Sequence, residues 1–402
     1  MDIVGEIRAF NANREAERLH IKYDHMRASS FAFFRGGCHL FYDQLPQGGI
    51  FKSAPLTWVC GDLHIENFGS YKGDNRLVYF DLNDFDEAAL APVSWELVRM
   101  LTSIRMWASG VGAPTKQEEA LCASFINTYA TELAKGKSYW FERETATGLI
   151  QSLLDNLRTR NRAQFLNTRT TLKGKRRRLL TDGRRALPAS PKQRLQVSEF
   201  MTAFAQTQAH PEFYKVLDIA RRIAGTGSLG VERYAILVEG KGSPDHNYVL
   251  DMKQCLPASL APFLKAAKFA QPKWQTQAER VVNIQHKMQA MPIAFLQAVT
   301  MGEQSYVLRG LQPSEDRVAF DLTRHSLSDI HGTLSDMGKL TAWAELRSAG
   351  HGGSANVDDL MAFAVRKKWR LKLLDISQDL SAQVKHDALL FNEAYDDHAL
   401  ID

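Results

Sequence analysis

The sequence has few cysteines and no long apolar run, and both absences narrow the possible classes of protein. Its four cysteines are widely spaced with no C-x-x-C pair, which argues against a disulfide framework or a zinc knuckle: Cys38, Cys60, Cys122 and Cys255. No stretch approaches the roughly 18 apolar residues of a membrane-spanning helix, and residues 1–20 lack the apolar centre of a signal peptide. We therefore expect a soluble, cytoplasmic protein without a membrane partner.

A strong overall charge is also absent, but one segment is very basic. The 402-residue chain carries 50 Lys and Arg against 45 Asp and Glu, a formal net charge of +5. Residues 158–194 hold thirteen Lys and Arg and a single acid, Asp182. Such a segment is most simply a solvated surface region, and the alternatives are contact with an anionic substrate or with nucleic acid. Phe165 is its only aromatic residue, which argues against nucleic acid.

The order of the predicted elements indicates an α+β protein. Aromatic and β-branched residues predict short strands at 56–60 and 76–82, the second within a hairpin, and apolar spacing predicts two helices between residues 93 and 136. Between about 215 and 312 the pattern predicts five short strands and one helix. Residues 321–402 are predicted to be helical.

The stretch 60–88, CGDLHIENFGSYKGDNRLVYFDLNDFDEA, concentrates acids and amides around an apolar strand. Asp62 and Asn67 have the spacing of the protein-kinase catalytic loop, whose Asp accepts the proton of the substrate hydroxyl and whose Asn binds magnesium. Burying several carboxylates without a cation is costly. We therefore expect Asn67 and Asp81 to hold Mg2+, with Asp84 as a further ligand. Which carboxylate binds the metal stays open among Asp81, Asp84 and Asp86, and a polar turn with Asx caps is the alternative.

A glycine-rich segment, GTGSLG at 225–230, precedes residues that are predicted to form a strand. A dinucleotide-binding G-x-G-x-x-G turn opens a helix instead, so the context favours the hairpin that covers the ATP phosphates in kinases. An ordinary hairpin turn is the alternative. On the kinase interpretation, the loop residues that bind the nucleotide are Gly225, Gly227, Ser228 and Gly230.

Lys253 ends the next predicted strand, YVLDMK, in the place of the kinase lysine that pairs with the α- and β-phosphates. The helix that follows offers Glu279 as an ion-pair partner for this lysine, with Gln285 as a weaker alternative. Glu279 also lies near the predicted start of that helix, where an acid complements the helix dipole. We expect Lys253 to be catalytic and Glu279 to support it at the nucleotide.

Several of these segments together resemble a known family. GDLHIENFG, FDLNDFDEA and the preceding FFRG look like an uncharacterised bacterial domain-of-unknown-function family associated with the protein-kinase-like superfamily. The G-D-L-H-x-x-N form is also similar to aminoglycoside and choline kinase-type phosphotransferases. The resemblance implies a two-lobed kinase-like fold and ATP-dependent phosphoryl transfer. It also puts Glu96 where kinase-like folds place an acid that braces the catalytic loop.

The order of the motifs differs from that of a kinase, because the glycine loop and Lys253 follow the catalytic loop by more than 150 residues. A circular permutation would reconcile them. It would place the first part of the large lobe in 1–209, a small antiparallel β lobe in 210–312 and a second helical part of the large lobe in 313–402. It also predicts that Lys253 and Asp81 face one cleft.

The sequence thus predicts an ATP- and Mg2+-dependent phosphotransferase acting on a hydroxyl acceptor, a small molecule rather than a protein. The basic segment suggests an anionic acceptor. One alternative is a metal-dependent phosphoesterase, since G-D-x-H also opens the motifs of dinuclear metallohydrolases, although a downstream G-N-H segment is absent. Another is a non-catalytic nucleotide-binding module. The acceptor and the oligomeric state stay open.

Overall fold

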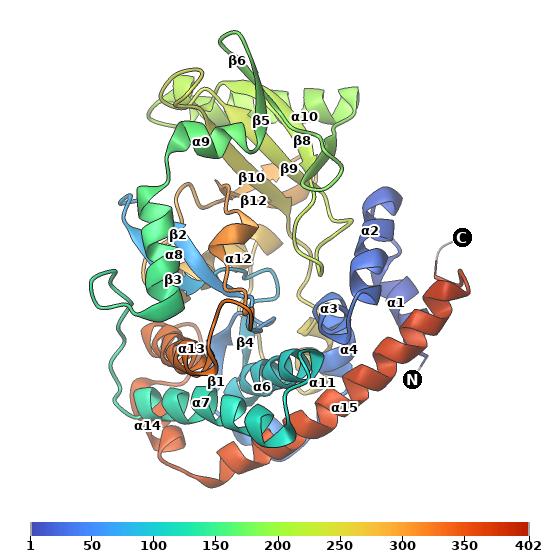
Figure 1. Cartoon of the computed structure of the whole chain (residues 1–402), viewed down its shortest axis with the longest axis vertical. Coiled ribbons are helices and arrows are strands. Elements are labelled where there is room, and N and C mark those ends of the chain that lie inside the picture. The colour runs from blue at the N-terminus through green and yellow to red at the C-terminus, as the bar shows by residue number, and fades with distance from the viewer. Residues whose placement is uncertain (1, 401–402) are drawn as a thin grey trace.

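A six-stranded antiparallel sheet forms one end of the protein and helices form the other (Figure 1), in a computed structural model that describes residues 2–400. Three two-stranded antiparallel sheets lie elsewhere in the described chain, so the predicted α+β class is confirmed. The strand order across the large sheet is β11 (Gln297–Met301), β12 (Gln304–Gly310), β10 (Tyr248–Gln254), β9 (Arg233–Val238), β8 (Val216–Arg222) and β7 (Ala186–Pro188).

Different segments cover the two faces of this sheet. Helix α10 (Pro191–Gln206) packs on one face, in a buried cluster that includes Ile236 of β9. The next residue, Leu237, faces the opposite side and packs with Leu166 of α9 (Arg162–Asn167). This alternation is the period-two pattern of a strand that is buried on both faces.

The five strands predicted between residues 215 and 312 are β8 to β12, so that prediction is confirmed. The predicted helix is α12 (Gln277–Met288), and a short helix that was not predicted, α11 (Ala261–Ala266), precedes it. The sheet also includes β7, and therefore begins upstream of residue 210, the expected start of the β lobe. This difference arises because a three-residue strand carries too short a pattern to be predicted.

The basic segment 158–194 is more ordered than a solvated surface region. Arg177 within it is buried, and its guanidinium donates to Asp245 at 2.9 Å. Part of the segment is therefore built into the fold, and its charge is not all directed to solvent. Besides α9, β7 and the start of α10, the segment contains the end of α8 (Gly148–Thr159) and a hairpin of β5 (Thr170–Lys173) and β6 (Arg176–Leu179).

Two small sheets bring the two halves of the 60–88 stretch together. β1 (Leu56–Val59) pairs with β4 (Ala89–Pro92), and β2 (Phe68–Lys72) forms the predicted hairpin with β3 (Val78–Leu82). Because β1 and β4 are antiparallel, the residues after β1 and those before β4 leave the sheet at the same end. Before these strands lie α1 (Ile3–Asn11), α2 (Ala16–Arg27), α3 (Ser30–Gly36), α4 (Cys38–Asp43) and α5 (Ile50–Ser53).

Helices form the other end of the molecule (Figure 1). Gly338 allows two of them, α7 (Thr115–Leu133) and α13 (Leu327–Ser348), to approach closely, because a Cβ at this position would lie 2.5 Å from the carbonyl oxygen of Phe125. No helix in residues 2–400 is both long and apolar enough to cross a membrane. The predicted helices are confirmed as α6 (Val93–Gly110), α7 (Thr115–Leu133), α13 (Leu327–Ser348), α14 (Val357–Ala364) and α15 (Lys368–Asp396), and two 3-10 turns are η1 (Pro211–Tyr214) and η2 (Ser314–Asp316).

Candidate functional site

A cavity of about 1480 Å³ lies where the glycine-rich loop, β10, the 60–88 stretch and the N-terminal helices meet. Its volume exceeds the several hundred Å³ of a typical small-molecule pocket, so it has room for two ligands side by side. The predicted site residues that line it are Asp62, Asp84, Gly225, Gly227, Ser228, Gly230 and Lys253, and Asp86 lines it too. Three other predicted site residues do not line it: Asn67, Asp81 and Glu279.

The glycine-rich loop connects the antiparallel strands β8 and β9, as the predicted strand–loop–strand pattern requires. Gly225 and Gly230 have φ angles of 74° and 87°, a conformation that glycine adopts without strain. A Cβ on Gly230 would also lie 2.7 Å from the Cβ of Arg14. The backbone conformation therefore explains why glycine occupies these two positions, and both residues also line the cavity.

Lys253 forms an ion pair with Asp86, which is 167 positions away in the sequence. Its side chain is buried, and burial lowers its pKa, although the carboxylate of Asp84 opposes that shift. The ion pair expected with Glu279 is not formed. Glu279 lies in the first turn of α12, where its carboxylate accepts from the backbone N–H of Gln275 at 3.0 Å. The N-cap itself is Thr276, so Glu279 supports the start of its own helix and does not contact Lys253.

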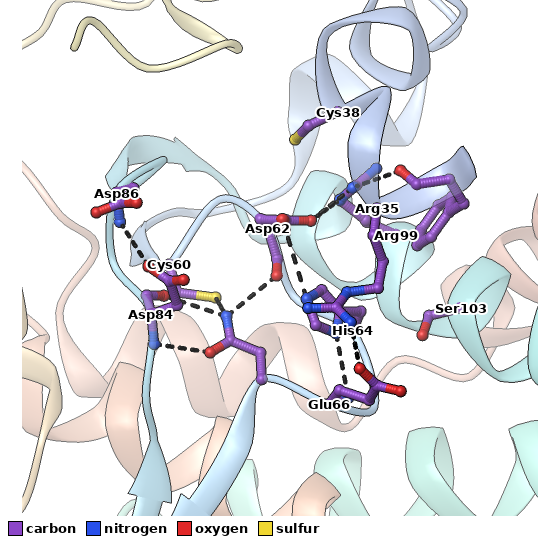
Figure 2. Close-up of polar contacts among 12 residues, drawn as sticks. Arg35, Cys38, Cys60, Asp62, His64, Glu66, Asp84, Asp86, Arg99 and Ser103 are labelled. Carbon is purple, nitrogen blue, oxygen red and sulfur yellow. Dashed lines mark hydrogen bonds and ion pairs between the residues drawn. The ribbon is translucent and has the colours of Figure 1, made fainter. Parts of the chain in front are cut away.

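Asp62 is held by a residue that the sequence did not single out. Its Oδ1 accepts from Nε and Nη2 of Arg99, at 2.8 and 2.5 Å, while its Oδ2 lies 4.0 Å from Nε2 of His64 (Figure 2). Arg99 is fully buried in α6. Burial lowers its pKa, but the charge of Asp62, the hydrogen bonds to it and smaller effects of Cys38 and Tyr42 together outweigh burial and raise the pKa above the ordinary value. An arginine within the apolar pattern VSWELVRML was the signal that could have revealed this contact.

Glu96, one turn before Arg99 in α6, braces the start of the same loop. Its Oε1 accepts from the backbone N–H groups of Cys60 at 2.7 Å and Gly61 at 3.2 Å. This contact places an acid at the start of the loop, as the family resemblance implied; that the loop is a kinase-like catalytic loop stays a prediction. Burial raises the pKa of Glu96 to about 7, although the two N–H groups favour the ionised form.

Asn67 joins the loop after β1, residues 60–67, to the acidic turn between β3 and β4, residues 83–88, instead of facing the cavity. Its Oδ1 accepts from the backbone N–H groups of Asp84 at 2.8 Å and Asn83 at 3.3 Å. Its Nδ2 donates to the carbonyl oxygens of Asp62 and Asp84, each at 3.1 Å. The side-chain oxygen expected to bind Mg2+ is thus occupied by backbone donors in this conformation.

Asp81, like Asn67, is bound by backbone groups of the protein. It is buried on β3, where Oδ2 accepts from the N–H of Ala290 at 3.0 Å and Oδ1 from that of Leu82 at 2.9 Å. Burial raises its pKa. Contrary to expectation, Asp81 does not line the cavity with Lys253, because backbone N–H groups of Ala290 and Leu82 hold both oxygens of its carboxylate. Its role as a metal ligand stays a prediction.

Asp84 and Asp86, from the turn between β3 and β4, line the cavity together with Lys253. Burial would raise the pKa of Asp84, but Lys253, Arg309 and Arg317 outweigh it and hold that pKa well below its ordinary value. Within residues 2–400 no cluster of three or more His, Cys, Asp or Glu forms a protein-only metal site. Two neighbouring carboxylates nevertheless suit Mg2+, which commonly takes its remaining ligands from phosphates and water.

Residues 14–394 match a family model described as "Uncharacterized protein conserved in bacteria (DUF2252)". The chain belongs to this family. The match includes the glycine-rich loop, Lys253 and the whole 60–88 stretch, so these cavity-lining segments lie within the family domain. No curated protein and no solved structure matches the chain.

Proposed function

We propose that this protein is an ATP- and Mg2+-dependent phosphotransferase with a circularly permuted, two-lobed kinase-like arrangement. The observation that carries the proposal is the meeting of Lys253 and the glycine-rich loop with Asp62, Asp84 and Asp86 around one cavity. These are the residue types that phosphoryl transfer needs, and they come from two segments that lie far apart in the chain, 62–86 and 225–253. In this arrangement the β-rich part around 210–312 supplies the nucleotide lobe, and 1–209 with 313–402 supplies the other.

The nucleotide would bind with its phosphates under residues 225–230 and its α- and β-phosphates beside Lys253. In the structure that lysine is paired with Asp86, so phosphate binding would exchange one anionic partner for another. Asp84 and Asp86 would then hold Mg2+, which neutralises charge on the phosphates and orients them. The low pKa of Asp84 favours this role, because a metal ligand must be deprotonated.

Asp62 would accept the proton of the acceptor hydroxyl. Arg99 binds only one oxygen of this carboxylate, and the residue lines the cavity with its side chain 21% exposed. One oxygen is therefore held and the other is accessible, which is the geometry of an oriented general base. A small hydroxyl-bearing acceptor fits a cavity that has space beyond a nucleotide.

The test is MgATP binding, measured by calorimetry on the full chain, with Lys253→Met, Asp84→Asn and Asp62→Asn. We expect Lys253→Met and Asp84→Asn to weaken MgATP binding at least about tenfold, since each removes a charge contact to phosphate or metal. Asp62→Asn should bind MgATP like the parent and lose turnover with any acceptor that is found.

A matched control is Lys192→Met, at an exposed position of α10. Parent-like MgATP binding by both Lys253→Met and Asp84→Asn would overturn the proposal. Metal-dependent phosphoester cleavage without ATP would instead support a phosphoesterase.

A further inference from the structure

A second cavity, of about 350 Å³, lies beside the β2–β3 hairpin and shares no lining residue with the first. Its wall comes from β2 and the turn after it, α8, α9, the start of β10, the segment before β11, and the end of β12 with the residues that follow it. In Figure 1, α8, α9 and β2 lie on the left, whereas α1, α3 and α4, which border the first cavity, lie on the right. The two cavities are therefore separate sites.

Four cations and two carboxylates line this second cavity, and one of the cations is neutralised. Arg160 forms an ion pair with Asp316, through two hydrogen bonds. The other carboxylate, Asp74, accepts from the backbone N–H of Phe295 at 3.0 Å. The remaining cations have no carboxylate in ion-pair contact anywhere in residues 2–400: Lys72, Arg76 and Arg162.

The three unpaired cations are also held close together. Arg162 lies over the ring of Tyr248, with 3.7 Å from Cζ to the ring centroid, and Arg76 donates to the hydroxyl of the same tyrosine at 3.4 Å. Burial and then the charges of Arg162 and Arg160 lower the pKa of Lys72. Burial and Arg76 lower the pKa of Arg162, against the effect of Tyr248. Such crowding of like charges is relieved when an anion binds among them.

We propose that this cavity binds a compact phosphate-bearing small molecule, with Lys72, Arg76 and Arg162 contacting its phosphate oxygens. Planar guanidinium groups match phosphate geometry in two-point contacts. The volume, at the lower end for ligand pockets, suits one small ligand and not a nucleic-acid strand. Arg160 and Arg162 belong to the basic segment 158–194, so the proposed site would account for part of the positive charge of that segment. The proposal does not depend on phosphotransfer in the first cavity.

The experiment titrates pyrophosphate into the full chain by calorimetry. We expect saturable binding that Arg162→Gln and Lys72→Gln each weaken at least about tenfold, and that weakens as the salt concentration rises. Lys192→Gln, exposed on α10, should bind like the parent. Repeating the titration on Lys253→Met distinguishes any pyrophosphate that binds in the first cavity. Binding to the second cavity should persist in this variant.

Arg162→Lys keeps the positive charge but lacks the planar guanidinium group, and should bind pyrophosphate more tightly than Arg162→Gln. Both variants are checked for a parent-like melting temperature. The absence of saturable binding would overturn the proposal. So would binding that neither Arg162→Gln nor Lys72→Gln weakens, or binding that Lys253→Met abolishes. MgATP binding that fails while pyrophosphate binding at Arg162 persists would count against the proposed function alone.

Discussion

Glu96 and Arg99 lie on successive turns of α6 and both bind the loop that follows β1. Glu96 holds the backbone N–H groups of Cys60 and Gly61, and Arg99 holds the carboxylate of Asp62. Both side chains are fully buried. A buried charge needs a partner in a fixed position, so these two residues determine where the loop lies and which way Asp62 points.

The raised pKa of Glu96 predicts a pH-dependent stability. Its folded pKa of about 7 lies above the ordinary value of 4.5, so the native state binds the proton more tightly than the unfolded chain. This contribution is full below pH 4.5 and is lost as the pH rises to 7, by up to about 3 kcal/mol. Glu96→Gln should remove it, and so flatten the pH dependence of the free energy of unfolding between pH 5 and 8.

Urea denaturation of the parent and Glu96→Gln across this range measures the effect. Glu303→Gln, exposed in the β11–β12 turn, is the control and should follow the parent at every pH. An unchanged slope in Glu96→Gln would contradict the prediction. The charge of Glu96 also helps to raise the pKa of the buried Glu345, so the flattening in Glu96→Gln includes the change that the substitution makes in the titration of Glu345.

At the scale of elements, the N-terminal helices anchor the glycine-rich loop. Arg14 donates to the carbonyl oxygens of Gly227 at 2.6 Å and Leu229 at 2.8 Å, and Lys22 donates to that of Gly227 at 3.3 Å. The backbone N–H that begins α2, at Glu15, donates to the carbonyl oxygen of Gly230 at 2.9 Å. The loop carbonyls are thus held by the connection between α1 and α2 and by α2 itself, which restricts this loop more than a hairpin turn in solvent.

Gly230→Ala should disrupt this anchoring. The alanine would have an unfavourable φ of 87° and would place its Cβ 2.7 Å from the Cβ of Arg14. We expect a loss of about 2–4 kcal/mol in the free energy of unfolding, from strain and the clash together. Gly183→Ala, with φ of 73° and no atom within 4 Å of its Cβ, tests the strain alone and should lose only about 1 kcal/mol. Equal losses in the two variants would show that the contact with Arg14 is unimportant.

At the scale of the whole molecule, Arg280 connects segments that approach the site from three directions. From α12 it donates to the carbonyl oxygens of Ala88, Asp86 at 2.7 Å and Leu256 at 3.0 Å. These contacts tie the acidic turn to the segment that leaves β10, and so help to fix Asp86 near Lys253. Arg280 is itself buried, with its pKa lowered chiefly by burial.

Arg280→Met should therefore destabilise the protein strongly. It leaves three carbonyl groups without their donor, and we expect a loss of about 2–4 kcal/mol in the free energy of unfolding. Asn283→Ala, exposed on the same helix, is the control and should change stability by less than about 0.5 kcal/mol. Denaturation midpoints for the two variants measure the difference. A loss in Arg280→Met no larger than in Asn283→Ala would count against the connecting role.

Much of the fold was predictable because its signals are local. The alternation of residues in β8 to β12 and the helical spacing in α6 and α7 depend on neighbours a few positions away. The glycine-rich loop between two strands was predictable for the same reason. β7 was missed because its three residues pair with β8 only in the assembled sheet.

At the candidate site, the residue types were determined by the sequence itself: carboxylates at 62, 84 and 86, an amide at 67, glycines at 225–230 and a lysine at 253. Only the tertiary structure decided their partners. It turned Asp81 inward onto Ala290, committed Asn67 to backbone N–H groups, and paired Lys253 with Asp86 instead of Glu279. The physical reason is that a polar side chain is bound by whatever donor or charge lies nearest in space. For Lys253 that neighbour is Asp86, which lies 167 positions away and therefore outside the range of any local sequence pattern.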